Sequence, residues 1–170
     1  MSWRGAGRVT NPQFCGAQAE LAFASAGMIA AKPHLLSHVE AASAPVIAVT
    51  AWQMLFKYAR GTRGQMIMVV GAAGNVGAYA VQMAVYAGMY VVAIAWSDNE
   101  NLLRSLGVKY FLDSSKPAFE QQLPQVDVIL DTVGRSTLQR CVAALKPGGK
   151  LVTSVSTQLL PAGVIFSTPT

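Results

Sequence analysis

The sequence has unusually few charged residues. They make up 12% of the 170 residues, while 52% are hydrophobic, against roughly 25% charged in an average soluble domain. This scarcity excludes a disordered chain and a heavily solvated surface. It leaves a fold whose elements are buried on both faces, or a membrane segment. The length lies within the ~100–200 residues typical of one domain.

Histidine and cysteine are also scarce, with only His34, His38, Cys15 and Cys141 in the chain. They are too few and too dispersed to form a convincing zinc site, so no metal is expected. The shortage of histidine and the lack of a G-x-S-x-G motif argue against a serine hydrolase. No G-x-x-x-x-G-K-[ST] motif is present, which excludes a P-loop nucleotidase.

The chain shows no secretory signal and no concentrated basic surface. Polar residues soon follow Arg4 and Arg8, so no apolar signal core exists, and a cytoplasmic location is expected. The net charge of +5 is scattered, which argues against nucleic-acid binding. Only Lys57, Arg60 and Arg63 cluster; a basic helix end is the favoured interpretation, and a phosphate-binding patch is the alternative.

No charged residue occurs from Gln65 to Ser97, a stretch longer than the ~20 residues that cross a bilayer. The hydrophobic period changes at each glycine within it, which a lipid-facing helix has no reason to do. We therefore do not expect a membrane span. The glycines that divide the stretch are Gly71, Gly74, Gly77 and Gly88.

From Met66 onward, short β-branched strands alternate with helices that end at glycine, and this order predicts a doubly wound parallel sheet. Burial of such strands on both faces accounts for the scarce charge. The predicted strands are Met66–Val70, Tyr90–Ala95, Lys109–Leu112, Val126–Leu130, Lys150–Val155 and Val164–Ser167. The predicted helices are Asn75–Ala87, Asp98–Leu106, Pro117–Gln122 and Ser136–Leu145, the last followed by a turn at Lys146–Gly149.

Before the first of these strands the pattern is helical. Ser37 and Glu40 have the spacing of a capping box, which predicts a helix start. Pro45 restarts the helix, and the apolar residues of Val46–Tyr58 continue on a helical period.

The most informative motif is the glycine loop Val69-Val70-Gly71-Ala72-Ala73-Gly74-Asn75-Val76-Gly77, which follows a strand and opens a helix. Its glycines permit a tight turn and a close approach of backbone to a pyrophosphate, and the helix N-terminus favours phosphate. The spacing is G-x-x-G-x-x-G rather than G-x-G-x-x-G. We favour dinucleotide binding; the alternative is glycine placed for packing alone.

The residues after the second predicted strand decide how the ribose is held. An acid about 20 residues beyond the glycines binds ribose hydroxyls in dinucleotide folds, and counting from Gly77 reaches Ser97 beside Asp98. Ser97 and Glu100 also have capping-box spacing, so the alternative is that Ser97 caps a helix and Asp98 favours its positive end. Of the two interpretations, capping of a helix by Ser97 is slightly favoured over binding of the ribose.

Most of the chain, from about Gln13 to Ser156, resembles the zinc-independent quinone oxidoreductases, or zeta-crystallin-like family, of the medium-chain dehydrogenase/reductase superfamily. The resemblance rests on several motifs in family order. They are Gly16-Ala17-Gln18-Ala19-Glu20, Met28-Ile29-Ala30-Ala31-Lys32-Pro33, Ala48-Val49-Thr50-Ala51-Trp52-Gln53, the glycine loop, Arg104-Ser105-Leu106-Gly107, Val126-Asp127-Val128-Ile129-Leu130-Asp131-Thr132-Val133-Gly134 and Leu145-Lys146-Pro147-Gly148-Gly149-Lys150-Leu151.

This resemblance implies a Rossmann-type fold and metal-free, NAD(P)H-dependent transfer of hydride to a quinone or an α,β-unsaturated carbonyl. The protein then mainly positions the cofactor. The cofactor-binding residues implied by the motifs, together with the two after the second strand, are Thr50, Gly71, Ala73, Gly74, Asn75, Val76, Gly77, Ser97, Asp98, Thr132, Val133, Gly134, Ser154 and Val155. For Thr132 and Ser154, a local bond to backbone at a strand end is the alternative. No catalytic residue is assigned.

The sequence departs from the family pattern at the expected 2′-phosphate site. NADPH-using relatives place a base after the second strand and a tyrosine after the third, where this chain has Asp98-Asn99 and Ser114. Two lost contacts of ~1.5–3 kcal/mol each would remove a hundredfold or more of NADPH preference. NADP(H) is the family expectation, NAD(H) is not excluded, and these residues favour NAD(H).

The resemblance also implies a chain truncated at both ends. Residues 1–36 are interpreted as a remnant of a GroES-like catalytic domain, and residues 37–170 as the NAD(P)-binding domain, with a helical entry over 37–60. A homodimer through Val164–Ser167 is implied as well. Two alternatives stay open: a non-catalytic NAD(P)-binding fragment, and a methyltransferase, which Ala95 disfavours because it stands where that chemistry wants an acid.

Overall fold

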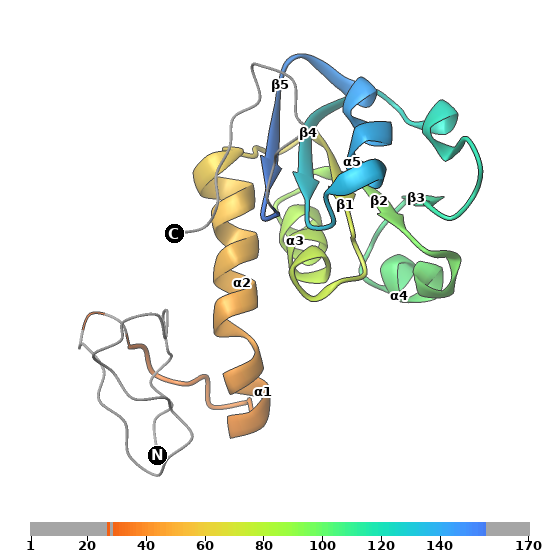
Figure 1. Ribbon diagram of the computed structural model, residues 1–170. Helices are drawn as coiled ribbons and strands as arrows, with labels where there is room; N and C mark the ends of the chain where they lie inside the picture. Colours follow the sequence, from red (N-terminus) through yellow and green to blue (C-terminus); the bar gives the residue numbers. More distant parts are fainter. Residues whose placement is uncertain (1–26, 28, 156–170) are drawn as a thin grey trace. The chain divides into compact units, whose positions relative to one another are not determined.

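The computed structural model describes residues 27 and 29–155 of the chain (Figure 1). Contacts along the chain divide it into two compact units, Met1–Val49 and Thr50–Thr170. The predicted boundary between residues 36 and 37 stays a prediction. All the elements of the sheet belong to the second unit.

Two helices carry the chain from the first unit into the second. Helix α1 (His38–Ser43) begins with the predicted capping box: Ser37 Oγ accepts a hydrogen bond from the Glu40 amide at 3.2 Å, and a Glu40 carboxylate oxygen accepts from the Ser37 amide at 2.8 Å. Helix α2 (Pro45–Trp52) begins at the predicted proline, and the π-helical segment η2 (Gln53–Tyr58) continues it. Pro at the first helical position loses no hydrogen bond that the helix needs.

Strands and helices alternate through the second unit as predicted. The strands are β1 (Met66–Val70), β2 (Tyr90–Ala95), β3 (Tyr110–Asp113), β4 (Val126–Asp131) and β5 (Leu145–Thr153). Between them lie α3 (Asn75–Tyr86), η3 (Ser97–Asn99), α4 (Glu100–Ser105), η4 (Phe119–Gln122), α5 (Arg135–Cys141) and η5 (Val142–Ala144).

All neighbouring strands pair in parallel, in the order β3-β2-β1-β4-β5. This order confirms the Rossmann-type α/β fold. Because the chain runs outward in both directions from the middle of the sheet, the order reverses between β1 and β4. In open α/β sheets, ligands bind at the carboxyl ends of the strands beside such a switch point.

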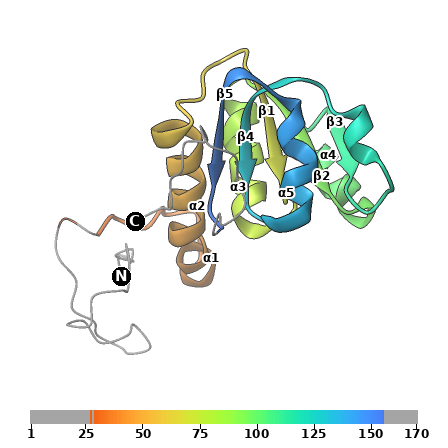
Figure 2. The same ribbon diagram turned by 45° about the horizontal axis from the view of Figure 1, so that its top comes forward.

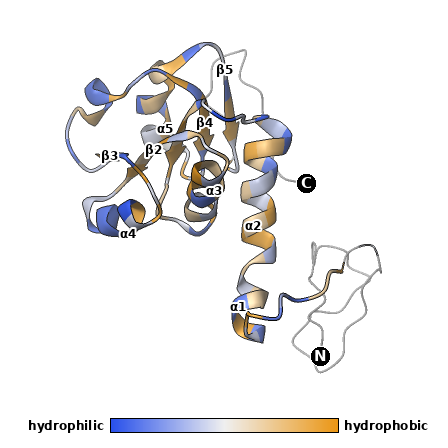
Figure 3. Cartoon of the chain, turned by 180° about the vertical axis from the view of Figure 1, so that it is seen from behind, coloured by the Kyte–Doolittle hydropathy of each residue, from blue (hydrophilic) through white to orange (hydrophobic). Residues whose placement is uncertain are grey.

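Apolar residues cover both faces of the sheet, as the scarcity of charge predicted. Side chains alternate along each strand, so Ile67 and Val69 of β1 join the core under α3, whereas Met68 and Val70 join the core that contains α5. Figure 2 shows α3 and α5 on opposite sides of the strands. Hydrophobic colouring runs along the strands in Figure 3, while much of α4 is hydrophilic.

The predicted turn at Lys146–Gly149 is a bulge inside β5 instead. Pairing with β4 jumps from Val126 opposite Leu145 to Val128 opposite Lys150. Gly148 has a φ of +77°, and Pro147 has no amide hydrogen for the ladder. Lys146 holds the bulge to β4 through a 2.7 Å ion pair with Asp127.

The charge-free stretch forms β1, the glycine loop, α3 and β2. In the part of the chain that the structure describes, no helix is long and apolar enough to cross a membrane. The predicted strand Val164–Ser167 lies outside the described residues, within which β5 forms one edge of the sheet.

Candidate functional site

The glycine loop lies at the switch point, between the end of β1 and the start of α3. It is fastened to the neighbouring strand, because the amides of Gly71 and Ala72 both donate to the Ile94 carbonyl, at 3.0 and 3.1 Å. The Gly74 amide then donates to the Gly71 carbonyl at 3.0 Å and closes the turn. The loop is therefore held in one conformation by backbone contacts.

Helix α3 opens directly from this turn. Gly74 is its N-cap, and no side chain caps it. The amides of the first turn of a helix have no partner within the helix, and they carry about half a positive charge together. The predicted residues Asn75, Val76 and Gly77 form this first turn, so their amides are available to a phosphate.

At two glycines of the loop, neighbouring atoms lie so close that no side chain could be accommodated. A Cβ at Gly77 would lie 2.1 Å from the Gly71 carbonyl oxygen and 2.9 Å from the Ala72 Cα, so the helix could not pack on its own loop. Gly71 has a φ of +81°, and a Cβ there would lie 2.4 Å from Thr132 Oγ1 and 2.6 Å from Val133 Cγ2. The glycine loop thus directly contacts the segment that follows β4.

The segment Thr132–Gly134 after β4 supplies the other side of the site. The Thr132 amide and hydroxyl both donate to the Val70 carbonyl, at 3.1 and 2.9 Å. This bond fastens the end of β4 to the end of β1. Val133 is 44% exposed, so a predicted site residue lies over the glycine loop with its outer surface open to a ligand.

Asp131, the last residue of β4, organises this segment. Its side chain is fully buried, and Oδ1 accepts hydrogen bonds from the amides of Val133 and Gly134, at 3.1 and 2.8 Å. Oδ2 accepts a bond of 2.7 Å from the Thr153 hydroxyl at the end of β5. Sequence reasoning did not select Asp131 or Thr153, although an acid that directly follows the apolar run Val128–Leu130 is a usable signal.

The end of β5 completes the row of strand ends. Ser154 donates from its amide to the Asp131 carbonyl at 3.0 Å, and Thr153 Oγ1 accepts from the Val155 amide at 3.0 Å. A Cβ at Gly134, whose φ is +72°, would lie 3.2 Å from Val155 Cγ1. The structure therefore places the predicted residues after β1, β4 and β5 side by side.

The side chains of Thr132 and Ser154 form the local bonds that were the alternative to a ligand role. Each donates to a backbone carbonyl at a neighbouring strand end, Thr132 to Val70 and Ser154 to Asp131, the latter at 3.4 Å. A role in cofactor binding stays a prediction for both. Thr50 is half-buried on α2, and its role also stays a prediction.

The residues after β2 form a 3₁₀ turn rather than the second predicted capping box. Trp96 is the N-cap of η3 and no side-chain bond caps it, because the tight turn places the Asn99 amide on the Trp96 carbonyl at 3.0 Å. Ser97 and Asp98 are exposed, and the Ser114 amide donates to the Ala95 carbonyl at 2.9 Å. The ends of β2 and β3 thus lie together at the expected ribose end.

Asp113 links these two strand ends. Hydrogen bonds from the Ser115 hydroxyl and amide, at 2.7 and 2.9 Å, hold the pKa of the Asp113 carboxyl below its usual value, and the Ser97 amide adds to this effect. Sequence reasoning missed Asp113 because the third strand was expected to end at Leu112, one residue earlier.

No group of three histidine, cysteine or acidic side chains that could hold a metal occurs among residues 27 and 29–155. His34 and His38 are both exposed, and burial raises the pKa of the Cys141 thiol to about 12. Zinc ligands need deprotonated thiols or convergent imidazoles, so the described residues do not fit a zinc centre.

A family model described as zinc-binding dehydrogenase matches residues 75–164. The mouse protein named NAD(P)H oxidoreductase RTN4IP1, mitochondrial, is 34% identical over 154 residues, which are 85% of this chain and 39% of the relative. The tomato protein named 2-methylene-furan-3-one reductase is 35% identical over 143 residues, covering 83% of this chain and 36% of the relative. The chain thus spans about two fifths of the length of these relatives.

Among solved structures, the quinone oxidoreductase from Coxiella burnetii superposes with a TM-score of 0.72 at 30% sequence identity. The match covers 76% of this chain and 41% of the bacterial one. It extends the similarity from sequence to the three-dimensional arrangement of the sheet and helices.

Proposed function

Since the chain belongs to the zinc-binding dehydrogenase family, within the medium-chain dehydrogenase/reductase superfamily, we propose that it binds NAD(P)H and serves hydride transfer to a quinone or an α,β-unsaturated carbonyl. One observation carries the proposal: the glycine loop contacts Thr132–Gly134 at the switch point of the sheet. Relatives whose names state NAD(P)H oxidoreductase and quinone oxidoreductase support it.

The residues at the switch point fit a dinucleotide. Gly71 and Gly77 leave the backbone uncovered, and the uncapped first turn of α3 can receive the pyrophosphate. Val133 and Gly134 would lie along the nicotinamide end, and Ser154 and Val155 would close the cleft. The bound cofactor supplies the hydride; the chain binds it, orients it and excludes water.

The proposed site does not favour NADPH over NADH. Asp98 is exposed after β2, where a base would neutralise a 2′-phosphate, and Ser114 occupies the place of the family's tyrosine. Segment 96–100 contains two acids and no base. The family resemblance favours NADP(H), whereas the residues after β2 and β3 favour NAD(H).

The experiment follows cofactor fluorescence and NAD(P)H consumption with a naphthoquinone as acceptor. The test variant is Gly74→Asp, and Gly74→Asn is its matched control. Gly74 has a φ of −70° and its added Cβ would meet only the Gly71 carbonyl, at 3.3 Å. Both variants can therefore cap α3, but only the aspartate puts negative charge where the pyrophosphate binds.

We expect fluorescence enhancement and turnover in the natural sequence, with both reduced far more by Gly74→Asp than by Gly74→Asn. Enhancement without turnover would support the non-catalytic alternative. No enhancement from a folded chain would contradict the proposal. Dialysis against a zinc chelator should leave cofactor binding unchanged, because we propose that the reaction uses no metal.

A cytoplasmic location and a homodimer through Val164–Ser167 are parts of the same proposal. Support for the dimer comes from β5, which ends the described sheet with an unshared row of backbone groups. Light scattering on the purified chain would measure its mass in solution. A monomer at all concentrations would contradict the dimer.

A further inference from the structure

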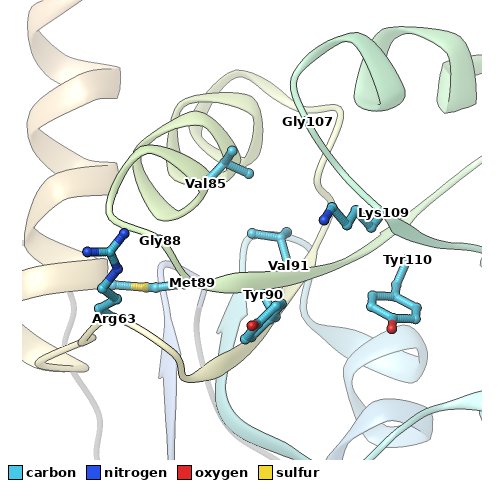
Figure 4. Close-up of a pocket in the computed structure, with 9 residues that line it drawn as sticks. All are labelled: Arg63, Val85, Gly88, Met89, Tyr90, Val91, Gly107, Lys109 and Tyr110. Carbon is cyan, nitrogen blue, oxygen red and sulfur yellow. The ribbon is translucent and has the colours of Figure 1, made fainter.

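A second concave site lies at the amino ends of the strands, at the end of the sheet opposite the glycine loop. It is a pocket of about 320 Å³, lined at the starts of β2 and β3 by Tyr90 and Tyr110, with Arg63 and Lys109 beside them (Figure 4). In a parallel sheet these amino ends lie away from the carboxyl ends where the dinucleotide site is built. The pocket is therefore separate from the proposed cofactor site.

The pocket carries two cationic groups and no acid. Within the described ranges, ion pairs engage Arg104, Arg140 and Lys146, whereas Arg63 and Lys109 have neither an acidic partner nor a side-chain hydrogen bond. The carboxylate at this edge of β4, Asp127, is already bound by Lys146 and by the Met66 amide.

The ends of α3 and α4 lie beside these cations and partly offset them. Each helix C-terminus carries at most about half a negative charge, and α4 has only six residues. Two full positive charges exceed this sum. The field in the pocket is therefore positive and suits an anion.

Backbone contacts fix the position of Arg63. The Gly64 amide donates to the Gly88 carbonyl at 3.0 Å, and the Thr62 amide donates to the Gln65 side-chain oxygen at 2.8 Å. The arginine stem lies over Gly88, where a Cβ would come within 2.9 Å of Arg63 Nε. Gly88, with a φ of +77°, is therefore the residue that lets the guanidinium lie at the pocket.

Lys109 is held in a comparable way. The Arg104 guanidinium, itself paired with Glu100 at 3.0 Å, donates to the backbone carbonyl of Lys109. In the view of Figure 4, Val91 lies between Arg63 and Lys109. The two charges therefore flank an apolar floor.

Tyr90 and Tyr110 contribute only to the rim of the pocket. Tyr110 pairs with Val92, and Tyr90 precedes Val92 by two residues, so both side chains leave the sheet on the face opposite Val91. Each tyrosine is 53% exposed, and neither hydroxyl is bonded to a described residue. The volume is at the lower end of the ~300–1,000 Å³ of ligand sites. We propose that this pocket binds a small anion that carries a phosphate or a carboxylate group.

The test titrates phenyl phosphate into the uniformly ¹⁵N-labelled full chain while NADH saturates the dinucleotide site. We expect saturable amide shifts at Val91, Gly107 and Lys109, and tighter binding of phenyl phosphate than of phenol, which has the same ring without the charge. Benzoate in place of phenyl phosphate shows which anion the pocket prefers.

Arg63→Gln and Lys109→Gln should each weaken phenyl phosphate binding by about five- to tenfold, since each removes one charge-assisted contact at a partly exposed site. Lys57→Gln is the matched control, because it removes an exposed positive charge of η2 that does not line the pocket. The amide spectra report at the same time that each variant is folded.

Three results would overturn the proposal. One is the absence of saturable shifts up to about 10 mM ligand, an affinity too weak for a specific site. Another is an equal loss of affinity in Lys57→Gln, which would mean attraction to net charge. The last is a set of amide shifts confined to residues 71–77, which would place the ligand in the dinucleotide site. Because NADH already occupies that site in the titration, failure of this proposal can be distinguished from failure of the proposed cofactor binding.

Discussion

The hydroxyl of Thr153 donates a hydrogen bond of 2.7 Å to Oδ2 of Asp131, and both side chains are buried. The bond joins the ends of β5 and β4. Because Asp131 Oδ1 holds the amides of Val133 and Gly134, Thr153 acts through Asp131 on the segment that contacts the glycine loop. Two residues that do not reach the ligand surface thereby set the shape of the site.

Replacing Thr153 with valine tests this relationship. Valine keeps the size of the side chain but leaves a buried carboxylate oxygen without its donor, which costs about 1–3 kcal/mol of unfolding free energy. We expect weaker cofactor binding as well, measured by NADH fluorescence in conditions where the variant is fully folded. Thr153→Ser, which retains the hydroxyl, should recover most of the affinity; equal affinity in all three proteins would contradict a positioning role.

Two glycines of the same loop should respond very differently to alanine. A Cβ at Gly77 would meet backbone at 2.1 Å, whereas one at Gly74 would meet only an oxygen at 3.3 Å. Gly77→Ala should lower the free energy of unfolding by about 2–4 kcal/mol, as overpacking against rigid backbone does. Gly74→Ala should change it by less than about 1 kcal/mol. Urea unfolding of both variants measures the difference, and similar losses would refute this account of the loop.

Hydrophobic period and glycine placement were sufficient to predict the sheet. Each strand that was expected within the described residues is present, because buried parallel strands are continuous apolar runs. The capping box at Ser37 was also predictable, since it depends on two residues three apart. At Ser97 the same spacing failed, because the Asn99 amide donates to the Trp96 carbonyl and closes a tighter 3₁₀ turn.

The glycine loop was predictable from local sequence, and the segments after β4 and β5 from the family motifs, but the contacts between strands were not. The glycine loop is a short motif, so its residues could be selected directly. Asp131 and Thr153 are 22 positions apart, and only the pairing of β4 with β5 brings them together. The bulge at Lys146–Gly149 was missed for a similar reason, because Asp127 on the neighbouring strand holds Lys146 in place.

The choice between NADH and NADPH should depend on Asp98 and Ser114. We expect NADPH to bind no tighter than NADH, because Asp98 repels a 2′-phosphate and residues 96–100, directly after β2, include no base. Asp98→Arg combined with Ser114→Tyr should raise the ratio of NADPH to NADH affinity by about a hundredfold, from two contacts of ~1.5–3 kcal/mol each. Fluorescence titration with both cofactors gives the ratio.

The control for this exchange is Asn101→Arg, which adds one positive charge at an exposed position of α4. It should leave the ratio within a few fold of the natural sequence. A strong NADPH preference in the natural sequence would show that other residues bind the 2′-phosphate.

Asp127 should make stability depend on pH. The hydrogen bond from Lys146, followed by that from the Met66 amide, lowers the pKa of the Asp127 carboxyl in the folded chain. A lowered pKa means that folding favours the charged form, so the stabilisation is complete above the ordinary pKa of about 3.9 and is lost as the pH falls through the lower folded value. Asp127→Asn should therefore lower the free energy of unfolding by about 0.5–1 kcal/mol near pH 7.

The same variant should differ little from the natural sequence once the pH lies below the folded pKa of Asp127, where both side chains are uncharged. Denaturant unfolding at several pH values measures the difference. Salt should reduce it near pH 7, because the ion pair is partly exposed. A difference that stays constant from pH 7 to a pH below the folded pKa of Asp127 would show that charge on Asp127 does not contribute.

Cys141 should be unreactive in the folded protein. It is the last residue of α5, its side chain is fully buried, and burial raises the pKa of the thiol to about 12. At pH 8 only about one molecule in ten thousand would then carry the reactive thiolate. In a Cys15→Ser variant, which leaves Cys141 as the sole thiol, Ellman's reagent should release no colour from the native protein and one equivalent after unfolding in guanidinium. Helix α5 must open before the reagent can reach the thiol. The rate of slow labelling at low denaturant therefore reports the stability of the core on that face of the sheet. A labelling rate equal to that of a free thiol would contradict the burial of Cys141.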